Sequence, residues 1–216
     1  PTLASVSIVS DNANDASRAN AGDLITVSLT ASEPLAIPSV SIAGQAATVS
    51  GAGVSFTATY TVVGAAVVEG LASIRIVYED IASNAGAVVT SVTDSSEVTI
   101  DKTAPTLILL TIVSSNAADT SRANVGDTIT LSIAASESIV TPTVSIADNA
   151  ASVSGSLSNY TAVYTITDAT HVSEGTTGIS VSFEDRASNV GVTLTRVMDL
   201  SRVTIDLTPP TLSQVS

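Results

Sequence analysis

The side chains with the clearest capacity for chemistry are acidic residues that occur twice in the same sequence setting. The stretch EVTID at 97–101 recurs as RVTID at 202–206, so Asp206 is the counterpart of Asp101. Carboxylate oxygens are preferred ligands of Ca²⁺, and one ion takes about six to eight oxygen ligands. An acid repeated at the end of a strand therefore raises the question of a cation site.

A purely local role for these acids is the alternative. Asp and Asn in turns commonly accept hydrogen bonds from nearby backbone N–H groups, and Asp101 then only ends its strand. Glu33 and Glu137 then serve as charges that discourage pairing at the end of a sheet. The chain contains no EF-hand loop and no glycine-rich Ca²⁺-binding nonapeptide, so the sequence leaves both alternatives open.

The sequence contains few residues and motifs that could catalyse a reaction. The chain has one His, at position 171, and no Cys, which excludes a thiol nucleophile and thiolate metal sites. It contains neither a G-x-S-x-G motif nor a glycine-rich phosphate loop. The acid pairs Glu79–Asp80 and Glu184–Asp185 recur, but neighbours on a strand point to opposite faces and cannot form the opposed carboxylates of a glycosidase. We therefore expect that the protein is not an enzyme.

The charge of the chain narrows the choice of partners. Its 216 residues carry a formal net charge of −13, which opposes binding to nucleic acids and to anionic membranes. No apolar run approaches the ~18–20 residues that a membrane span requires. We expect neither a nucleic-acid partner nor membrane insertion by this segment.

A repeated unit positions the acids. Several short stretches return in the same order: SRAN at 17–20 and 121–124, ASE at 31–33 and 135–137, and VSIA at 40–43 and 144–147. Self-similarity at a fixed period indicates a tandem array. We predict one repeat at 1–104, a second at 105–209 and the start of a further copy at 210–216, so the chain is expected to come from a longer array.

Each repeat has the pattern of β-strands. Within DLITVSLTAS, Ile25, Val27, Leu29 and Ala31 lie on one face, and Thr and Ser occupy the other, as in a half-buried antiparallel strand. The predicted strands of the first repeat are 3–10, 23–32, 38–43, 46–50, 55–63, 72–79 and a bulged strand at 88–101. This pattern predicts an all-β protein of two tandem immunoglobulin-like β-sandwich domains, with about seven strands each. An odd number of strands carries the chain from one pole of a sandwich to the other, so successive copies are expected to stack head to tail.

Three motifs connect the unit to a known family. The joints TIDKTAP and TIDLTPP, the turns YEDIASNAG and FEDRASNVG, and the loops ANAGD and ANVGD occur in fixed order in both copies. In these features the chain resembles the tandem bacterial Ig-like repeats of large extracellular adhesins. The resemblance implies a cell-surface location, an extended rod and Ca²⁺ at the domain junctions. The turns depart from the common DxAGN pattern of such repeats, since this chain has DIASN and DRASN.

The strand order predicts which acids meet at the junction. The end of the last strand, the first loop and the loop after residue 63 lie at the far pole of the first copy. The loops around Glu137 and Asp185 lie at the near pole of the second copy. The predicted Ca²⁺ ligands at this junction are Asp101, Glu137 and Asp185, with Asp15, Glu69 and Asn189 as further candidates. The equivalent residues at the outer junctions are Glu33, Asp80 and Asp206.

The joints favour a mechanical function. Pro105 and Pro210 fix their own φ and push the preceding residue toward an extended conformation, so the joints resist bending more than a Gly/Ser link would. We predict spacer repeats of an extracellular surface protein, with neighbouring copies of the repeat as partners. Two alternatives remain open: a filament subunit whose Thr/Ser faces pack laterally or carry glycans, and a carbohydrate- or protein-binding module.

Overall fold

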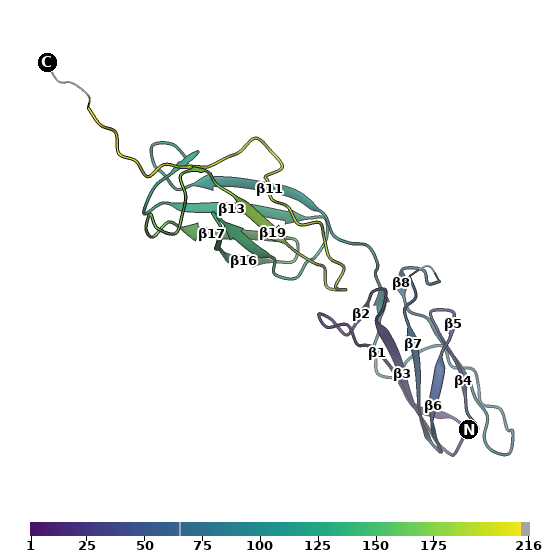
Figure 1. Ribbon diagram of the computed structural model, residues 1–216. Helices are drawn as coiled ribbons and strands as arrows, with labels where there is room; N and C mark the ends of the chain where they lie inside the picture. Colours follow the sequence, from purple (N-terminus) through teal and green to yellow (C-terminus); the bar gives the residue numbers. More distant parts are fainter. Residues whose placement is uncertain (65, 213–216) are drawn as a thin grey trace. The chain divides into compact units, whose positions relative to one another are not determined.

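The computed structural model describes residues 1–64 and 66–212, which contain β-strands and no helix. The chain divides into two compact units (Figure 1). The first contains Pro1–Thr103 together with Arg186–Asn189, and the second contains Ala104–Asp185 and the residues from Val190 onward. The last part of the predicted further copy, residues 213–216, lies outside the described residues.

The described part of the first unit contains ten strands, several of them very short. Its strands are β1 (Leu3–Ser10), β2 (Arg18–Ala19), β3 (Leu24–Ala31), β4 (Ser39–Ile42), β5 (Gln45–Ala46), β6 (Thr48–Ala52), β7 (Ser55–Thr61), β8 (Gly70–Leu71), β9 (Ile74–Val77) and β10 (Thr99–Ile100).

The second unit repeats the same order. Its strands are β11 (Leu107–Ser114), β12 (Arg122–Ala123), β13 (Thr128–Ala135), β14 (Thr143–Ile146), β15 (Asn149–Ala150), β16 (Ser152–Ser156), β17 (Asn159–Thr165), β18 (Gly175–Thr176), β19 (Ile179–Ser182) and β20 (Thr204–Ile205).

Each unit is a sandwich of two main sheets with a small third sheet at one pole. In the first unit the sheets have the strand orders β1-β3-β7-β6, β5-β4-β9 and β2-β10-β8. In the second unit the equivalent orders are β11-β13-β17-β16, β15-β14-β19 and β12-β20-β18. The prediction of all-β, immunoglobulin-like sandwiches in tandem is confirmed.

Alternation along the strands creates the core. Ile25, Val27, Leu29 and Ala31 of β3 are buried between the sheets, as predicted. The cores contain mainly Ile, Val, Leu and Ala, and each unit has its own cluster of buried residues. Because these side chains alternate with Thr and Ser, the outer faces of the two four-stranded sheets are largely hydroxyl-bearing.

The predicted strand at 88–101 is wrong over most of its length. Only β10 is a strand there, and the preceding residues 86–98, together with 191–203 in the second unit, are here called the G segment. The cause is local: the Asp94 carboxylate accepts hydrogen bonds from the backbone N–H and the hydroxyl of Ser96, at 3.0 and 2.7 Å, and Ser95 has a φ of 64°. Side-chain caps of this kind compete with a regular ladder.

The G segment connects the two faces of the sandwich. It first pairs with β9, through Val89 and Ile76, and then crosses to β1. There the Thr93 N–H donates to Val6 O at 2.8 Å, and the Thr93 hydroxyl accepts from Val6 N–H at 2.9 Å. Farther along, the Ser96 hydroxyl accepts from Ile8 N–H at 2.8 Å. The segment and β1 therefore run in the same direction.

Two further features differ from the predicted strands. The predicted strand 46–50 is divided between β5, which pairs with β4, and β6, which pairs with β7 on the other sheet. The short strands β2 and β8 were not predicted, because two-residue strands carry no periodic pattern. Both pair with β10 and close one pole of the unit.

The chain crosses each unit from one pole to the other. In the first unit, Leu3 lies opposite Ala31 at the start of β1, and Ser10 lies opposite Ile25 at its end. The exit strand β10 pairs with β2, beyond the end of β1. The N-terminus and β2 lie at opposite poles of the unit (Figure 1). The second unit has the same registers, with Leu107 opposite Ala135 and β20 paired with β12.

A search of the described residues for a membrane-spanning helix found none.

Candidate functional site

At the entry pole of the first unit, Asp80 organises the turn between β9 and the G segment. Its Oδ1 accepts hydrogen bonds from the N–H groups of Ala82 and Asn84, at 2.8 and 2.9 Å, and its Oδ2 accepts from the Asn84 side-chain amide at 2.7 Å. The Asn84 amide is the main cause of a lowered pKa at Asp80, followed by the Asn84 N–H. Asp80 is 8% exposed. It therefore performs the turn-capping role that was one of the two predicted alternatives.

Glu33 lies at the same pole, where β3 ends. Its Oε1 is 3.1 Å from the ammonium group of Pro1. Glu33 and Asp80 are thus two acids at the entry pole of the first unit.

The counterparts in the second unit are Glu137 and Asp185. A carboxylate oxygen of Glu137 lies within 4.8 Å of one of Asp185. Asp185 is 1% exposed, and Ile139 forms a bridge with it that fixes its backbone. Two oxygens bound to one Ca²⁺ at 2.3–2.6 Å are at most about 5 Å apart. This pair of carboxylates therefore fits a shared cation and supplies only part of the six to eight ligands.

At the exit pole, the loop between β1 and β3 is organised by its own polar side chains. The Asn12 amide donates to Asp23 Oδ2 at 2.8 Å, and the Asn12 carbonyl oxygen accepts from the N–H groups of Asn14 and Asp15. Asn116 bonds Asp127 in the same way in the second unit, at 2.7 Å. These Asn residues were not among the predicted site residues, although Asn12 and Asn116 occupy the same position in the two copies.

Asp15 also caps its own turn. It accepts from the hydroxyl and the N–H of Ser17, at 2.7 and 3.0 Å, and the hydroxyl is the main cause of its lowered pKa. Within the first unit, the segment Arg186–Asn189 adds an ion pair between Arg186 and Asp15, at 3.0 Å. In the same unit, the Asn189 amide donates to the backbone oxygen of Asp101 at 3.0 Å.

Asp101 and Asp206 are held at the exit poles by backbone and charge. The N–H of Asp101 donates to Ala19 O, and the N–H of Asp206 donates to Ala123 O, each at 2.9 Å. Arg18 is 4.0 Å from the Asp101 carboxylate, and Arg122 is 3.5 Å from that of Asp206. Both acids end their strands as predicted, and each has an arginine beside it.

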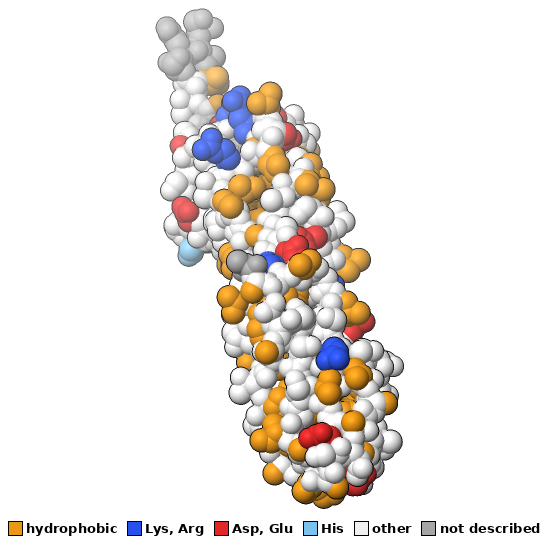
Figure 2. Space-filling view, turned by 90° about the vertical axis from the view of Figure 1, so that its right-hand side faces the viewer, with side chains coloured by type: hydrophobic (Ala, Val, Ile, Leu, Met, Phe, Trp, Pro, Cys, Tyr) orange, Lys and Arg blue, Asp and Glu red, His pale blue; other side chains and the backbone are white. Residues whose placement is uncertain are grey.

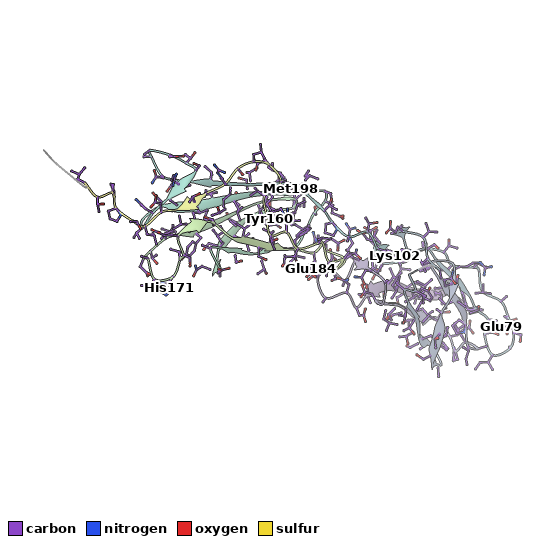
Figure 3. The ribbon with its side chains drawn as sticks, turned by 45° about the horizontal axis from the view of Figure 1, so that its top comes forward. Glu79, Lys102, Tyr160, His171, Glu184 and Met198 are labelled. Carbon is purple, nitrogen blue, oxygen red and sulfur yellow. The ribbon has the colours of Figure 1, made fainter. Side chains whose placement is uncertain are left out.

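Glu69 has a role that the sequence did not reveal. Its Oε1 accepts from the Lys102 N–H at 2.8 Å and from the Thr103 hydroxyl at 2.9 Å. The Lys102 N–H is the main cause of the lowered pKa of Glu69. The Lys102 ammonium group in turn donates to the backbone oxygens of Gly64 and Val67, and Figure 3 labels this lysine. The loop before β8 therefore holds the first residues of the joint.

The second unit has the same pair of hydrogen bonds from a Glu to its own joint, and this arrangement is here called the clamp. Glu174 Oε1 accepts from the Leu207 N–H at 2.8 Å and from the Thr208 hydroxyl at 2.7 Å. The pKa of Glu174 is lowered, mainly by the Thr208 hydroxyl. Glu69 and Glu174 thus act on the backbone of the joint in both copies, although Leu207 replaces Lys102.

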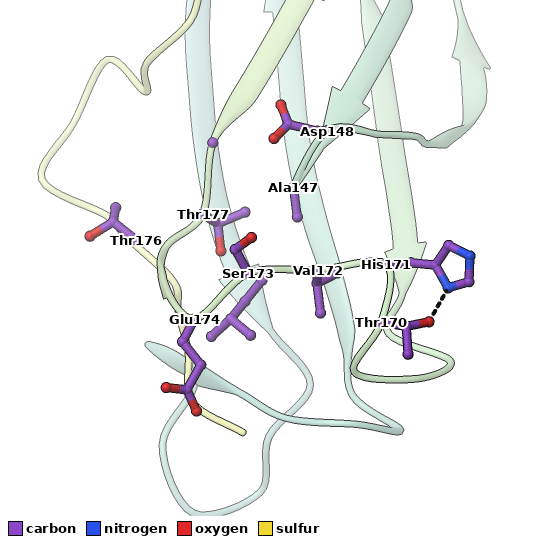
Figure 4. Close-up of a pocket in the computed structure, with 11 residues that line it drawn as sticks. Ala147, Asp148, Thr170, His171, Val172, Ser173, Glu174, Thr176 and Thr177 are labelled. Carbon is purple, nitrogen blue, oxygen red and sulfur yellow. Dashed lines mark hydrogen bonds between the residues drawn. The ribbon is translucent and has the colours of Figure 1, made fainter. Parts of the chain in front are cut away.

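His171 lies on a pocket of about 250 Å³ in the second unit (Figure 4). Its Nδ1 is 2.8 Å from Asp168 Oδ1 and 3.0 Å from the Thr170 hydroxyl. A catalytic triad needs the acid on one imidazole nitrogen and the nucleophile on the other. Here both partners face the same nitrogen, and the ring is exposed, so the arrangement caps the loop and does not activate the hydroxyl.

The chain is similar in structure to several multi-domain β proteins. It matches fibronectin(III)-like modules of CbhA from Clostridium thermocellum with 14% identity and a TM-score of 0.39, over 93% of both chains. It matches tandem Ig domains of titin with 12% identity and a TM-score of 0.28, over 88% of this chain and 92% of that one. The D00-D0 domain of intimin matches with 12% identity and a TM-score of 0.30, over 92% and 96%. The fold is assigned from the strand pairing within each unit.

No known family and no curated protein matches the sequence.

Proposed function

We propose that the chain consists of spacer repeats of a large extracellular surface protein, with repeats at 1–104 and 105–209 and a further copy beginning at 210. Such repeats hold a distal module away from the cell. Their partners are neighbouring copies of the same repeat.

The path of the chain through each unit carries this proposal. Entry and exit lie at opposite poles in both units, so a load applied to the ends of the chain passes through the whole length of each sandwich. The Glu69 clamp on Lys102 and Thr103, followed by Pro105, restricts the joint on the side of the first unit. Both features suit a stiff spacer.

Ca²⁺ at the repeat poles is the second part of the proposal. Glu137 and Asp185 of the second unit have the oxygen spacing that a shared Ca²⁺ requires. Glu33 and Asp80 occupy the same sequence positions in the first unit, and Asp101 and Asp206 end the preceding strands. A Ca²⁺ ion bound by these carboxylates would offset the electrostatic repulsion between them.

Small-angle scattering and thermal unfolding of the chain, with Ca²⁺ and with chelator, test both parts. We expect an extended particle whose thermal midpoint falls on chelation, and whose midpoint no longer responds to Ca²⁺ in Asp185→Asn. Asp199→Asn is the matched control, because Asp199 is an exposed turn acid that caps Ser201. A compact particle would contradict the spacer, whereas an extended particle indifferent to chelation would remove only the Ca²⁺.

A further inference from the structure

The first unit has a groove where the G segment leaves β9 and crosses to β1. Its volume is about 510 Å³, within the range of about 300–1,000 Å³ typical of binding pockets. Ile8 and Ile74 form its apolar floor, Leu71 stands at its edge with 66% exposure, and Glu97 is an exposed acid among its lining residues. Glu97 forms no ion pair within the described residues.

The corresponding G segment of the second unit has a different surface. The sequence SVTDSSE at 91–97 is replaced by RVMDLSR at 196–202, here called the basic loop. Met198 is 52% exposed and Leu200 is fully exposed. Arg196 and Arg202 are exposed and form no ion pair within the described residues. The change adds two large apolar side chains and reverses the charge at the position of Glu97.

The basic loop is held in place although Met198 and Leu200 are exposed. The Met198 N–H donates to Leu110 O at 2.9 Å, and the Ser201 hydroxyl accepts from Ile112 N–H at 3.0 Å. Asp199 caps Ser201 between these anchors. A surface already fixed in one conformation loses little entropy on binding. Figure 3 labels Met198 on this segment. Figure 2 shows hydrophobic side chains scattered over the visible surface, with few Lys and Arg side chains among them.

The two surfaces are complementary in chemistry. The groove offers apolar walls and a free carboxylate, and the loop offers two exposed apolar side chains between two free guanidinium groups. Covering an exposed Leu side chain with apolar surface lowers the free energy, because it removes apolar area from water. A polyanion is a poorer partner for the loop, because the net charge of −13 repels it.

We propose that the basic loop of one molecule docks into the first-unit groove of a second copy of this chain. Met198 and Leu200 cover Ile8, Ile74 and Leu71, and Arg202 or Arg196 pairs with Glu97. The contact joins two different surfaces, so each bound pair leaves one groove and one loop free. Such a contact grows into an open assembly. It adds lateral association to the proposed spacer and does not depend on it.

Sedimentation of the two-copy chain over a range of concentrations, at about 0.15 M salt, tests the contact. At this ionic strength the Debye length is about 8 Å, so the net charge is screened while paired groups in contact still attract. We expect concentration-dependent association. The variant Met198→Thr/Leu200→Ser, which carries the residues of the first copy, should weaken it about 10-fold or more, the effect of removing one buried Leu.

Charge exchange tests the pairing. Glu97→Arg and Arg202→Glu should each weaken association about 2- to 5-fold, as for an exposed ion pair, and the double variant should recover it. If Arg196 is the partner of Glu97, the double variant Glu97→Arg/Arg196→Glu restores association instead. Arg75→Glu makes the same change in net charge as Arg202→Glu, at a residue that lines neither surface, and should have no effect.

A mixture gives the sharpest outcome. Glu97→Arg molecules keep an intact loop, and Met198→Thr/Leu200→Ser molecules keep an intact groove, so the mixture should associate more strongly than either variant alone. A chain that stays monomeric, or that associates equally well with the altered loop, overturns the proposal. Binding of wild-type chain to phosphatidylserine vesicles, lost in Arg196→Ser/Arg202→Ser, without self-association also overturns it, in favour of an anionic membrane partner.

Discussion

Gly191 is the position where one added methyl group should be most damaging. A Cβ on this glycine would overlap the Phe183 ring, and a Cβ on Gly86 would overlap Tyr78 in the first unit. Phe183 is 5% exposed, and the Gly191 N–H donates to its backbone oxygen at 3.0 Å. The ring therefore cannot move without leaving the core, and the backbone cannot move without losing that hydrogen bond.

The expected cost of Gly191→Ala lies between two limits. Relaxation by small shifts costs about 1–3 kcal/mol, as for other overpacked cores. Full expulsion of a Phe exposes about 150–250 Å², which costs about 4–6 kcal/mol at ~25 cal/mol/Å². We expect about 2–4 kcal/mol, confined to the second unit. At about 4–8 °C per kcal/mol, its thermal midpoint falls by at least about 8 °C.

Calorimetry of the two-copy chain, with urea unfolding as a second probe, measures this change. Gly178→Ala is the matched control, since a Cβ there meets nothing within 4 Å. In a Phe183→Leu background, Gly191→Ala should cost less, because the overlapping ring is gone. Equal stability of Gly191→Ala and Gly178→Ala in the wild-type background would refute the reasoning.

Three further predictions concern buried polar contacts and pH. Tyr160→Phe should cost about 0.5–1.5 kcal/mol in urea unfolding, because the Tyr160 hydroxyl donates to the buried Ile139 O at 3.0 Å; Phe56, its natural counterpart, shows that the ring alone fits. Asn116→Ala should cost about 1–2 kcal/mol by leaving Asp127 without its amide donor, whereas the exposed Asn124→Ala should change little. The pKa of Glu69 and of Glu174 lies below the ordinary 4.5, so their contribution is present above that pH and is lost as the pH falls through the lowered pKa. Thermal midpoints at decreasing pH should show a shallower decline in Glu174→Ala than in the wild type, and parallel declines would contradict the clamp.

The long strands could be predicted because burial alone determines their pattern. Ile25, Val27 and Leu29 alternate with polar residues, and any two-layer structure that buries one set exposes the other. The G segment could not be predicted as irregular in this way. Its departure from a ladder depends on Asp94 and Ser96, whose side chains replace the backbone bonds of a regular strand.

Among the acids of the candidate site, those with contacts close in sequence could be predicted and those with distant contacts could not. Asp80 and Asp15 bond to residues two to four positions away, so their capping role was visible as an alternative in the sequence. Glu69 acts on Lys102 and Thr103, more than thirty positions along the chain, and no local pattern could have indicated the clamp. The exposure of Leu200 likewise depends on how the loop is anchored to β11.

The parallel course of the G segment and β1 determines how each unit resists being stretched. When the two ends of a unit are pulled apart, the bonds between these segments are strained along their length together and cannot open one at a time. Val6, Ile8 and the Thr93–Ser96 stretch share four such bonds in the first unit. In the described part of the second unit, Met198 and Ser201 provide two, because Met198 has no hydroxyl to offer Leu110. In a single-molecule pulling experiment the second unit should therefore be the first to give way, and the first should remain folded to a higher force.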